Sequence, residues 1–246
     1  MEWWRKFFDK DTERILFPEK RLKVTTKECD FIEEALNLPE HAKILDLACG
    51  IGRHSIELAK RGYNVTGLDY STVFVNKAKK MAKDAKVNVR FFQGDMRKIP
   101  FKNKFDAVIN MFTSFGYFHK DEDNMKVLKA VAKCLNRRGK FLLDTVNRDW
   151  LIRHFQAKDW YQCDDDILVL EERKLNLERS RIETKWIMIK ESKRKEYFHS
   201  LRLFTHSELL ELLNRAKLKV LASYGGFEKE SVSFDSNRLI ILSQKE

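Results

Sequence analysis

The chain has 246 residues, of which 43% are hydrophobic, and it carries a formal net charge of +11. This length suits one α/β domain with an insertion, or two small domains, and the apolar content excludes a disordered chain. No apolar stretch approaches the roughly 20 residues of a membrane-spanning helix, and the N-terminus lacks the apolar segment of a signal peptide. We therefore expect a cytoplasmic protein with no membrane partner.

The four cysteines are far apart and form no Cys-x-x-Cys pair. A disulfide framework and a zinc site are therefore both disfavoured, and we expect no metal. Cys49 lies in a glycine-containing loop, where it is interpreted as a small residue beside a ligand and, as the alternative, as a nucleophile. The 48 basic residues are interleaved with 37 acidic ones, so the net charge indicates either an attraction for RNA or only the composition of the source.

Residues 1–38 are predicted to form a helical lid at the N-terminus. Thr25 and Glu28 have the spacing of a capping box, and the helix that they begin should end before Pro39. The segment before this helix is aromatic and basic, and we interpret it as a lid that covers a bound ligand. A helix docked on the sheet and a dimer contact are the alternatives. The aromatic side chains concerned are Trp3, Trp4, Phe7 and Phe8.

Five short apolar runs then alternate with helical patterns, which predicts a parallel sheet with helices on both faces. Helices are expected after Gly52, after Asp69 and from about Asp121. The predicted strands are residues 44–47, 64–69, 87–92, 105–112 and 140–144.

Residues 167–204 alternate polar and apolar side chains, which predicts a three-stranded antiparallel meander. It belongs to a β cap insertion over 151–204, and the core comprises 1–150 and 205–246. Thr205 and Glu208 form a second capping box. The last two strands, 218–223 and 238–243, have no helix between them and should pair antiparallel. The fold class is thus a Rossmann-like, doubly wound α/β fold. Its seven-stranded sheet is mostly parallel, the last strand is reversed, and the antiparallel β insertion follows strand five.

The loop from Asp46 to Gly52 carries the strongest functional signal. It follows an apolar run, and a second acid, Asp69, closes the next run. This layout cradles a nucleoside, because small residues let backbone N–H groups approach the ligand while the second acid holds ribose hydroxyls. A phosphate-binding P-loop would need Gly-Lys-Ser/Thr where Arg53 begins the helix, and a dinucleotide site wants glycine where Ser55 stands.

S-adenosylmethionine suits this loop better, because its sulfonium and ammonium cations favour carboxylate neighbours. The chain resembles the class I S-adenosylmethionine-dependent methyltransferases, and more closely a prokaryotic subgroup of small-molecule enzymes. The resemblance covers roughly residues 40–150 and departs from the usual first motif at Ala48. The matching stretches are Asp46-Leu47-Ala48-Cys49-Gly50-Ile51-Gly52-Arg53-His54-Ser55, Gly94-Asp95-Met96-Arg97 and Thr113-Ser114-Phe115-Gly116-Tyr117-Phe118.

The resemblance implies roles for individual cofactor-binding residues. For Asp69 the alternative is an N-cap of the following helix, and for the cofactor carboxylate Lys23 and Arg21 both remain open. The implied positions are Ala48, Gly50 and Gly52 against the methionine portion, Asp46 at the ammonium, Asp69 on the ribose, Tyr70 over the adenine, Asp95 and Met96 at the adenine edge, Asn110 and Met111 beside the methyl group, and Lys23 or Arg21 at the carboxylate.

The methyl acceptor is expected to meet the segment that follows the fourth strand. Phe115, Tyr117 and His119 are predicted to face it, with core packing as the alternative for Phe115 and Phe118. No catalytic residue is assigned. The candidates for a base or for a group that stabilises charge are His119, Asp144, Asn147, His199 and Arg202.

These observations predict a methyltransferase that acts on an N or O nucleophile of a small molecule and releases S-adenosylhomocysteine. Asn110 is not followed by Pro-Pro-aromatic, and no Pro-Cys pair supplies a thiolate for pyrimidine C5 methylation. RNA or protein methylation through the basic surface, a non-catalytic cofactor-binding protein and a nicotinamide enzyme remain alternatives. The partners expected are a small molecule and, second, RNA. The chain should be a monomer or a homodimer.

Overall fold

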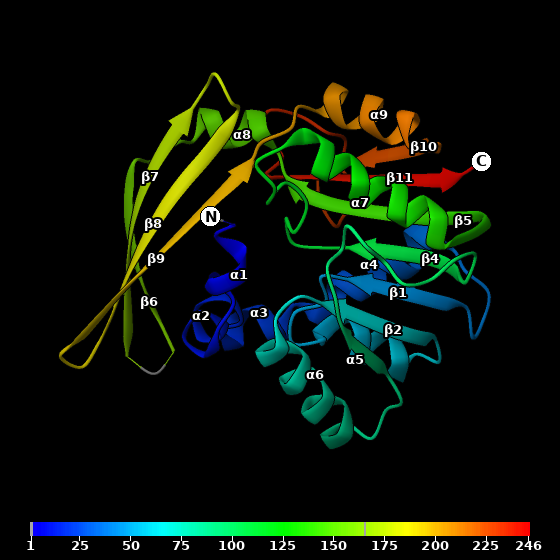
Figure 1. Cartoon of the computed structure of the whole chain (residues 1–246), viewed down its shortest axis with the longest axis horizontal. Helices are drawn as coiled ribbons and strands as arrows, with labels where there is room; N and C mark the ends of the chain where they lie inside the picture. Colours follow the sequence, from blue (N-terminus) through cyan, green and yellow to red (C-terminus); the bar gives the residue numbers. More distant parts are fainter. Residues whose placement is uncertain (1, 165) are drawn as a thin grey trace.

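The larger of two sheets contains seven strands in the order β10-β11-β5-β4-β1-β2-β3. It is seen in a computed structural model that describes residues 2–164 and 166–246 (Figure 1). The strands are β1 (Lys43–Leu47), β2 (Asn64–Asp69), β3 (Arg90–Gln93), β4 (Phe105–Asn110), β5 (Leu135–Val146), β10 (Leu218–Tyr224) and β11 (Arg238–Lys245).

Strand direction in this sheet confirms the predicted fold class. Strands β1 to β5 pair only in parallel with one another. Strand β11 runs antiparallel to both β5 and β10, so the last strand of the chain is the reversed one. Because the carboxyl ends of parallel strands meet at one edge, Leu47, Asp69 and Asn110 end their strands on the same side of the sheet.

Helices cover both faces of the sheet, and alternate residues of each strand are buried under one or the other layer. Ile44 packs with the layer of α4 and α5, whereas the next residue, Leu45, packs with α7 and α9. This period of two is expected for strands buried on both faces. The helices of the core are α4 (Thr25–Leu36), α5 (Arg53–Lys60), α6 (Thr72–Asp84), α7 (Asp121–Cys134), α8 (Arg148–Arg153) and α9 (His206–Arg215).

The smaller sheet is an antiparallel cap of four strands in the order β6-β7-β8-β9. The predicted three-stranded meander over 167–204 is confirmed as β7, β8 and β9, and β6 is a fourth strand that the sequence did not predict. No residue of β6 is fully buried, and its single alternating stretch is flanked by charged residues, so it resembles a loop in sequence. The strands are β6 (Lys158–Cys163), β7 (Ile167–Asn176), β8 (Arg181–Lys190) and β9 (Lys193–Arg202).

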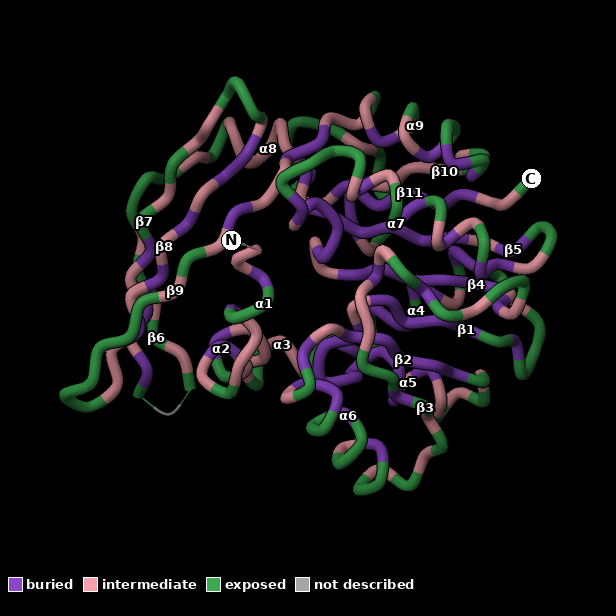
Figure 2. Tube along the Cα trace, in the orientation of Figure 1, coloured by how far each residue is buried: buried purple, intermediate pink, exposed green. Residues whose placement is uncertain are grey.

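Three short helices at the N-terminus lie between the cap sheet and the core (Figure 1). They are α1 (Trp4–Phe7), α2 (Lys10–Leu16) and α3 (Glu19–Lys23). Helix α4, in contrast, packs on the large sheet, where Ile32 is completely buried. The segment that covers the core is thus shorter than the predicted 1–38 lid. Figure 2 shows buried positions along α1 and α2 as well as along the central strands.

One of the two predicted capping boxes is confirmed. Thr205 accepts from the backbone N–H of Glu208, whose side chain accepts from the Thr205 N–H. The other was wrong, because α4 follows Val24 without a side-chain cap and Glu28 instead binds Arg53. Across the residues described, no helix is long and apolar enough to cross a membrane.

Candidate functional site

A cavity of about 120 Å³ lies at the carboxyl edge of β1, β2 and β4, beneath the N-terminal helices. Its walls come from the predicted glycine loop, from the ends of the strands and from the covering helices. Eight of its lining residues are among the predicted cofactor ligands: Asp46, Ala48, Gly50, Asp69, Tyr70, Asp95, Met96 and Met111.

The loop after β1 has a backbone that only small residues accommodate. Ala48 has φ 58°, and Gly50 has φ 57°, in the left-handed region that glycine favours. A Cβ atom on Gly50 would lie 2.7 Å from the ring of Phe17 in the covering segment. Gly52 lines no part of the cavity, because a Cβ there would meet Phe91 at 2.7 Å. Gly50 is thus the glycine that brings backbone close to the cavity.

Asp69 ties this loop to β2. Its Oδ2 accepts the Gly50 N–H at 2.8 Å, and its Oδ1 accepts the Ser71 N–H at 2.8 Å. The alternative role as an N-cap is wrong, because Ser71 is the residue that caps α6. Burial raises the pKa of Asp69 to about 6, although the two backbone N–H groups oppose the shift. The Asp69 carboxylate therefore lines the cavity, and keeping it ionised there without a partner costs free energy.

If Asp69 binds the ribose hydroxyls of S-adenosylhomocysteine, the affinity for this ligand should weaken about tenfold between pH 7 and pH 5, because only the ionised carboxylate accepts both hydroxyl protons. The free energy of unfolding depends on pH with the opposite sign. The folded-state pKa of about 6 exceeds the usual 3.8, so between these values the folded chain retains a proton that the unfolded chain has lost. Asp69 therefore lowers the free energy of unfolding as the pH rises through this window. Calorimetric titrations at four pH values test the first effect, and an affinity independent of pH contradicts it.

Asp46 lies beneath the loop and is buried. Its Oδ2 accepts from the Ser55 Oγ at 2.6 Å, and burial raises the pKa of its carboxyl. The thiol of Cys49 is also buried, and burial raises its pKa far above the ordinary value, so it is not a thiolate nucleophile. Cys49 therefore acts as the small residue of the loop.

The predicted adenine side of the cavity is built by Tyr70, Asp95 and Met96. Tyr70 packs edge-on against Trp4, with ring centroids 4.5 Å apart, and its hydroxyl accepts from Arg5 at 3.0 Å. Asp95 lines the cavity, but its carboxylate is held by Arg97, whose Nη2 lies 2.6 Å from Oδ2. That ion pair lowers the pKa of Asp95, although burial opposes the shift.

Besides Gly52, two predicted cofactor ligands lie away from the cavity. Lys23 is 71% exposed and pairs with Glu19, whereas Arg21 of the same helix lines the cavity. Asn110 is buried at the end of β4, where its Nδ2 donates to the Leu47 carbonyl of the neighbouring strand β1 at 2.7 Å. Its Oδ1 has no hydrogen-bond partner among the residues described.

The residues predicted to face or pack beside the methyl acceptor lie in three different environments. Tyr117 and Phe118 line the cavity. Phe115 is 1% exposed and packs on Phe204, so core packing, the alternative for this residue, is what the structure shows. His119 lines a second, more polar cavity of about 650 Å³ between the core and the cap.

Comparisons with known proteins give the family. A profile described as "Methyltransferase domain" matches residues 44–139. YqeM of Bacillus subtilis (strain 168), a protein named as a methyltransferase, is 29% identical over 214 residues, which cover 85% of this chain and 86% of that one. The solved structure of a S-adenosylmethionine-dependent methyltransferase from Clostridium acetobutylicum ATCC 824 has the same fold, with a TM-score of 0.79 and 21% identity over 89% of this chain and 91% of that chain.

Residues 44–139 thus form a methyltransferase domain, and the chain as a whole has the fold of a S-adenosylmethionine-dependent methyltransferase. Two further relatives match over about half of each chain. The glycine/sarcosine N-methyltransferase of Aphanothece halophytica is 32% identical over 53% of this methyltransferase and 51% of its own length. The dTDP-3-amino-3,4,6-trideoxy-alpha-D-glucopyranose N,N-dimethyltransferase of Streptomyces venezuelae is 31% identical over 51% of this chain and 50% of its own length.

The methyltransferase holds two of its candidate bases in structural hydrogen bonds. Asn147 caps α8 through the Asp149 N–H, and its Nδ2 donates to the carbonyls of Ser233 and Ser236. Asp144 is fully buried, where its Oδ2 accepts the Phe112 N–H at 2.9 Å.

The other two candidates lie away from the cavity of the methyltransferase. Arg202 pairs with Glu208 at 2.7 Å and lines the second cavity. His199 is half-buried beside Trp186, with ring centroids 5.0 Å apart, and desolvation of the imidazole lowers its pKa to about 4.

Sequence reasoning missed the basic side of the methyltransferase's cavity. Arg53 and His54 line it from the start of α5. The signal that could have found them is their place inside the first matching motif, directly after Gly52. Phe112, just after β4, also lines the cavity, as expected for the segment predicted to pass beside the methyl group.

Proposed function

We propose that this methyltransferase transfers a methyl group from S-adenosylmethionine to an N or O nucleophile of a small molecule in the cytoplasm. The observation that carries the proposal is the cavity where Asp46, Asp69 and Asp95 meet the glycine loop under the N-terminal helices. Three neighbouring strands supply these acids, as a nucleoside cofactor with cationic groups requires.

The charges of the cavity fit this cofactor and not a dinucleotide. A pyrophosphate would meet the buried carboxylates of Asp46 and Asp69, whereas a sulfonium and an ammonium group are attracted to them. Gly50 lines the cavity without a side chain, so a ligand can lie directly against the backbone of the loop. When bound, S-adenosylmethionine supplies an electrophilic methyl group, so the protein chiefly has to position the acceptor and exclude water.

In our proposal the residues of the loop and the strand ends take the cofactor. Asp46 attracts the ammonium group and Asp69 accepts from the ribose hydroxyls. Tyr70 covers the adenine ring, and the Met96 backbone with Asp95 meets its edge. Arg97 fixes the Asp95 carboxylate for that contact.

The enclosure of the cavity supports a small acceptor over a polymer. Trp4 and Phe8 close it from the N-terminal side, and Tyr117 with Phe118 wall it from the core. The acceptors named for two relatives, glycine or sarcosine and a dTDP-linked amino sugar, are both amines and not polymers. A small amine therefore comes first among the acceptors that we propose.

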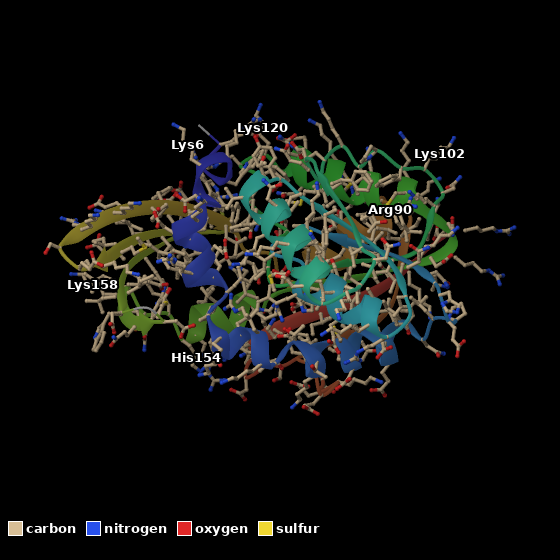
Figure 3. All side chains as sticks on the ribbon, turned by 90° about the horizontal axis from the view of Figure 1, so that it is seen from below. Lys6, Arg90, Lys102, Lys120, His154 and Lys158 are labelled. Atoms are coloured by element: carbon tan, nitrogen blue, oxygen red, sulfur yellow. The ribbon has the colours of Figure 1, made fainter. Side chains whose placement is uncertain are left out.

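The distribution of positive charge gives RNA methylation less support. Figure 3 shows that the labelled basic side chains are spread along the molecule, from Lys158 on the cap to Lys102 at the opposite end of the core. Lys6 comes from α1, Arg90 from β3, Lys120 from the turn before α7 and Lys158 from β6. Nucleic-acid binding usually requires such residues on one face.

The covering helices should retain the cofactor by closing over it. We expect Trp4→Ala to speed the dissociation of S-adenosylhomocysteine at least about tenfold, because Trp4 is 5% exposed and packs on Tyr70 and Phe118. Trp160→Ala is the matched control, since that ring is 67% exposed on the cap. Stopped-flow dissociation measures the rates. Equal rates in Trp4→Ala and the wild type would contradict the lid.

The test of the function has two stages. Calorimetry with S-adenosylhomocysteine and with NAD separates a methyltransferase from a nicotinamide enzyme. Labelled S-adenosylmethionine is then incubated with pools of small amines and alcohols and, separately, with tRNA. Labelled small molecules are expected. Label in tRNA alone would overturn the small-molecule proposal, and tight cofactor binding without transfer in any pool would support a non-catalytic role.

A further inference from the structure

Three arginine side chains surround one aromatic ring beside the cavity. The guanidinium carbons of Arg21, Arg53 and Arg238 lie 4.9, 4.5 and 5.2 Å from the centroid of Phe112. They come from α3, from the start of α5 and from the start of β11, so they are brought together only by the fold. Arg21, Arg53 and Phe112 line the cavity directly.

This cluster has more cations than carboxylates. Arg53 pairs with Glu28, which also accepts from His54, and Arg238 pairs with Asp144. Arg21 donates only to the Leu16 carbonyl among the contacts of the residues described. Burial and the repulsion of Arg53 and Arg238 lower the pKa of Arg21. A half-buried guanidinium with no carboxylate partner of its own is costly, so the cluster is suited to one further anion.

A hydrogen-bond donor in the cluster is also unused. The Arg53 side chain is 5% exposed, and its Nη2 has no hydrogen-bond partner among the residues described. Arg53 lines the cavity, so this nitrogen belongs to a buried side chain at the edge of an open space. A planar guanidinium with a free N–H matches a carboxylate oxygen.

The backbone holds the ring of Phe112 in place under these charges. Phe112 and Thr113 both have φ 58°, a left-handed conformation that non-glycine residues rarely adopt. The Phe112 N–H donates to Asp144, and the Thr113 N–H donates to the Asp144 carbonyl at 3.0 Å. Such strain persists only where the surrounding contacts enforce it, as at binding sites.

The position of the cluster separates it from the cofactor acids. Asp69 and Asp95 lie at the β2 and β3 side of the sheet, whereas Phe112, Asp144 and Arg238 lie at the β4, β5 and β11 side. Asp46, which also faces Arg53, is already held by Ser55 and assigned to the cofactor's ammonium. A ligand that reaches the cluster therefore extends past the cofactor acids toward β5.

We propose that Arg21 and Arg53 bind a carboxylate of the methyl acceptor at Phe112, so that the acceptors are small amines or alcohols that also bear a carboxylate. The inference rests on the proposed small-molecule methyltransferase function. A single negative charge matches the one cation in excess of Glu28 and Asp144, and for this reason a carboxylate suits the site better than a doubly charged phosphate. Arg238 remains paired with Asp144 and raises the positive potential behind the ring.

The test compares acids with their amides on the full chain saturated with S-adenosylhomocysteine. Calorimetry gives dissociation constants for glycine and glycinamide, acetate and acetamide, and 4-aminobenzoate and 4-aminobenzamide. At least one acid is expected to bind about 10-fold to 100-fold tighter than its amide. Arg21→Gln should abolish this preference, and Arg21→Lys should restore part of it. Lys23→Gln is the matched control, because Lys23 is exposed and pairs with Glu19, and it should keep the preference.

The outcomes separate the two proposals. Failure of the wild type to bind S-adenosylhomocysteine contradicts the proposed function. Binding of S-adenosylhomocysteine without any preference for acids contradicts the carboxylate subsite alone. If Arg21→Gln weakens S-adenosylhomocysteine binding and leaves 5′-methylthioadenosine binding and the acid preference unchanged, the anion is the cofactor's own carboxylate, and the inference is overturned.

Discussion

Replacement of Asp69 by Asn is expected to weaken the binding of S-adenosylhomocysteine about 100-fold. Each charge-assisted hydrogen bond to a ribose hydroxyl contributes about 1.5–3 kcal/mol, and the amide replaces one of two acceptor oxygens with a donor. That donor would also face one of the backbone N–H groups, of Gly50 or Ser71, that now donate to the carboxylate. The variant therefore loses a ligand contact and disturbs the loop at the same time.

Asp106→Asn is the control for this variant. Asp106 is an acid of β4 at the opposite edge of the sheet, where it accepts from the Lys43 N–H and from Asn136. It makes similar contacts far from the cavity, so its replacement should leave affinity within about twofold. Thermal melts show whether either variant remains folded. If folded Asp69→Asn binds S-adenosylhomocysteine as tightly as the wild type, Asp69 does not hold the ribose.

Most of the fold was predictable because its signals are local. The alternation of apolar runs with helical patterns predicts parallel strands, and the stretch without a helix before β11 predicts the reversed pairing that the structure confirms. β6 carried no such signal, since Trp160, its largest side chain, is exposed. The Thr25–Glu28 capping box failed because Glu28 has partners far away in sequence, Arg53 and His54.

The candidate site was predictable where a motif fixes it and not where the fold alone assembles it. The glycine loop and the acids follow from spacing. Lys23 and Arg21 are two residues apart on one helix, so they point about 200° apart, and composition cannot tell which faces the cavity. The arginine cluster at Phe112 joins residues whose numbers differ by more than two hundred, and only the tertiary structure brings Arg21 and Arg238 to the same ring.

The largest effect on stability is expected for Asp144→Ala. Asp144 is fully buried, where it accepts the Phe112 N–H and pairs with Arg238, whose Nε lies 2.7 Å from Oδ1. Removing one partner of a buried ion pair leaves an uncompensated charge, which costs about 3–5 kcal/mol. For a chain of this size, the melting temperature should fall by about 8–15 °C.

A double variant separates two causes of the lost stability, the unpaired charge of Arg238 and the unsatisfied N–H of Phe112. Asp144→Leu combined with Arg238→Met removes both charges and fills similar volume, so it should recover most of the stability lost in Asp144→Ala. A deficit of about 1–3 kcal/mol should remain, because the Phe112 N–H still has no acceptor. Urea denaturation measures the free energies of unfolding. If the double variant is as unstable as Asp144→Ala, the contact with the Phe112 backbone is what stabilises this edge of the sheet, and the charge of Arg238 is not the cause.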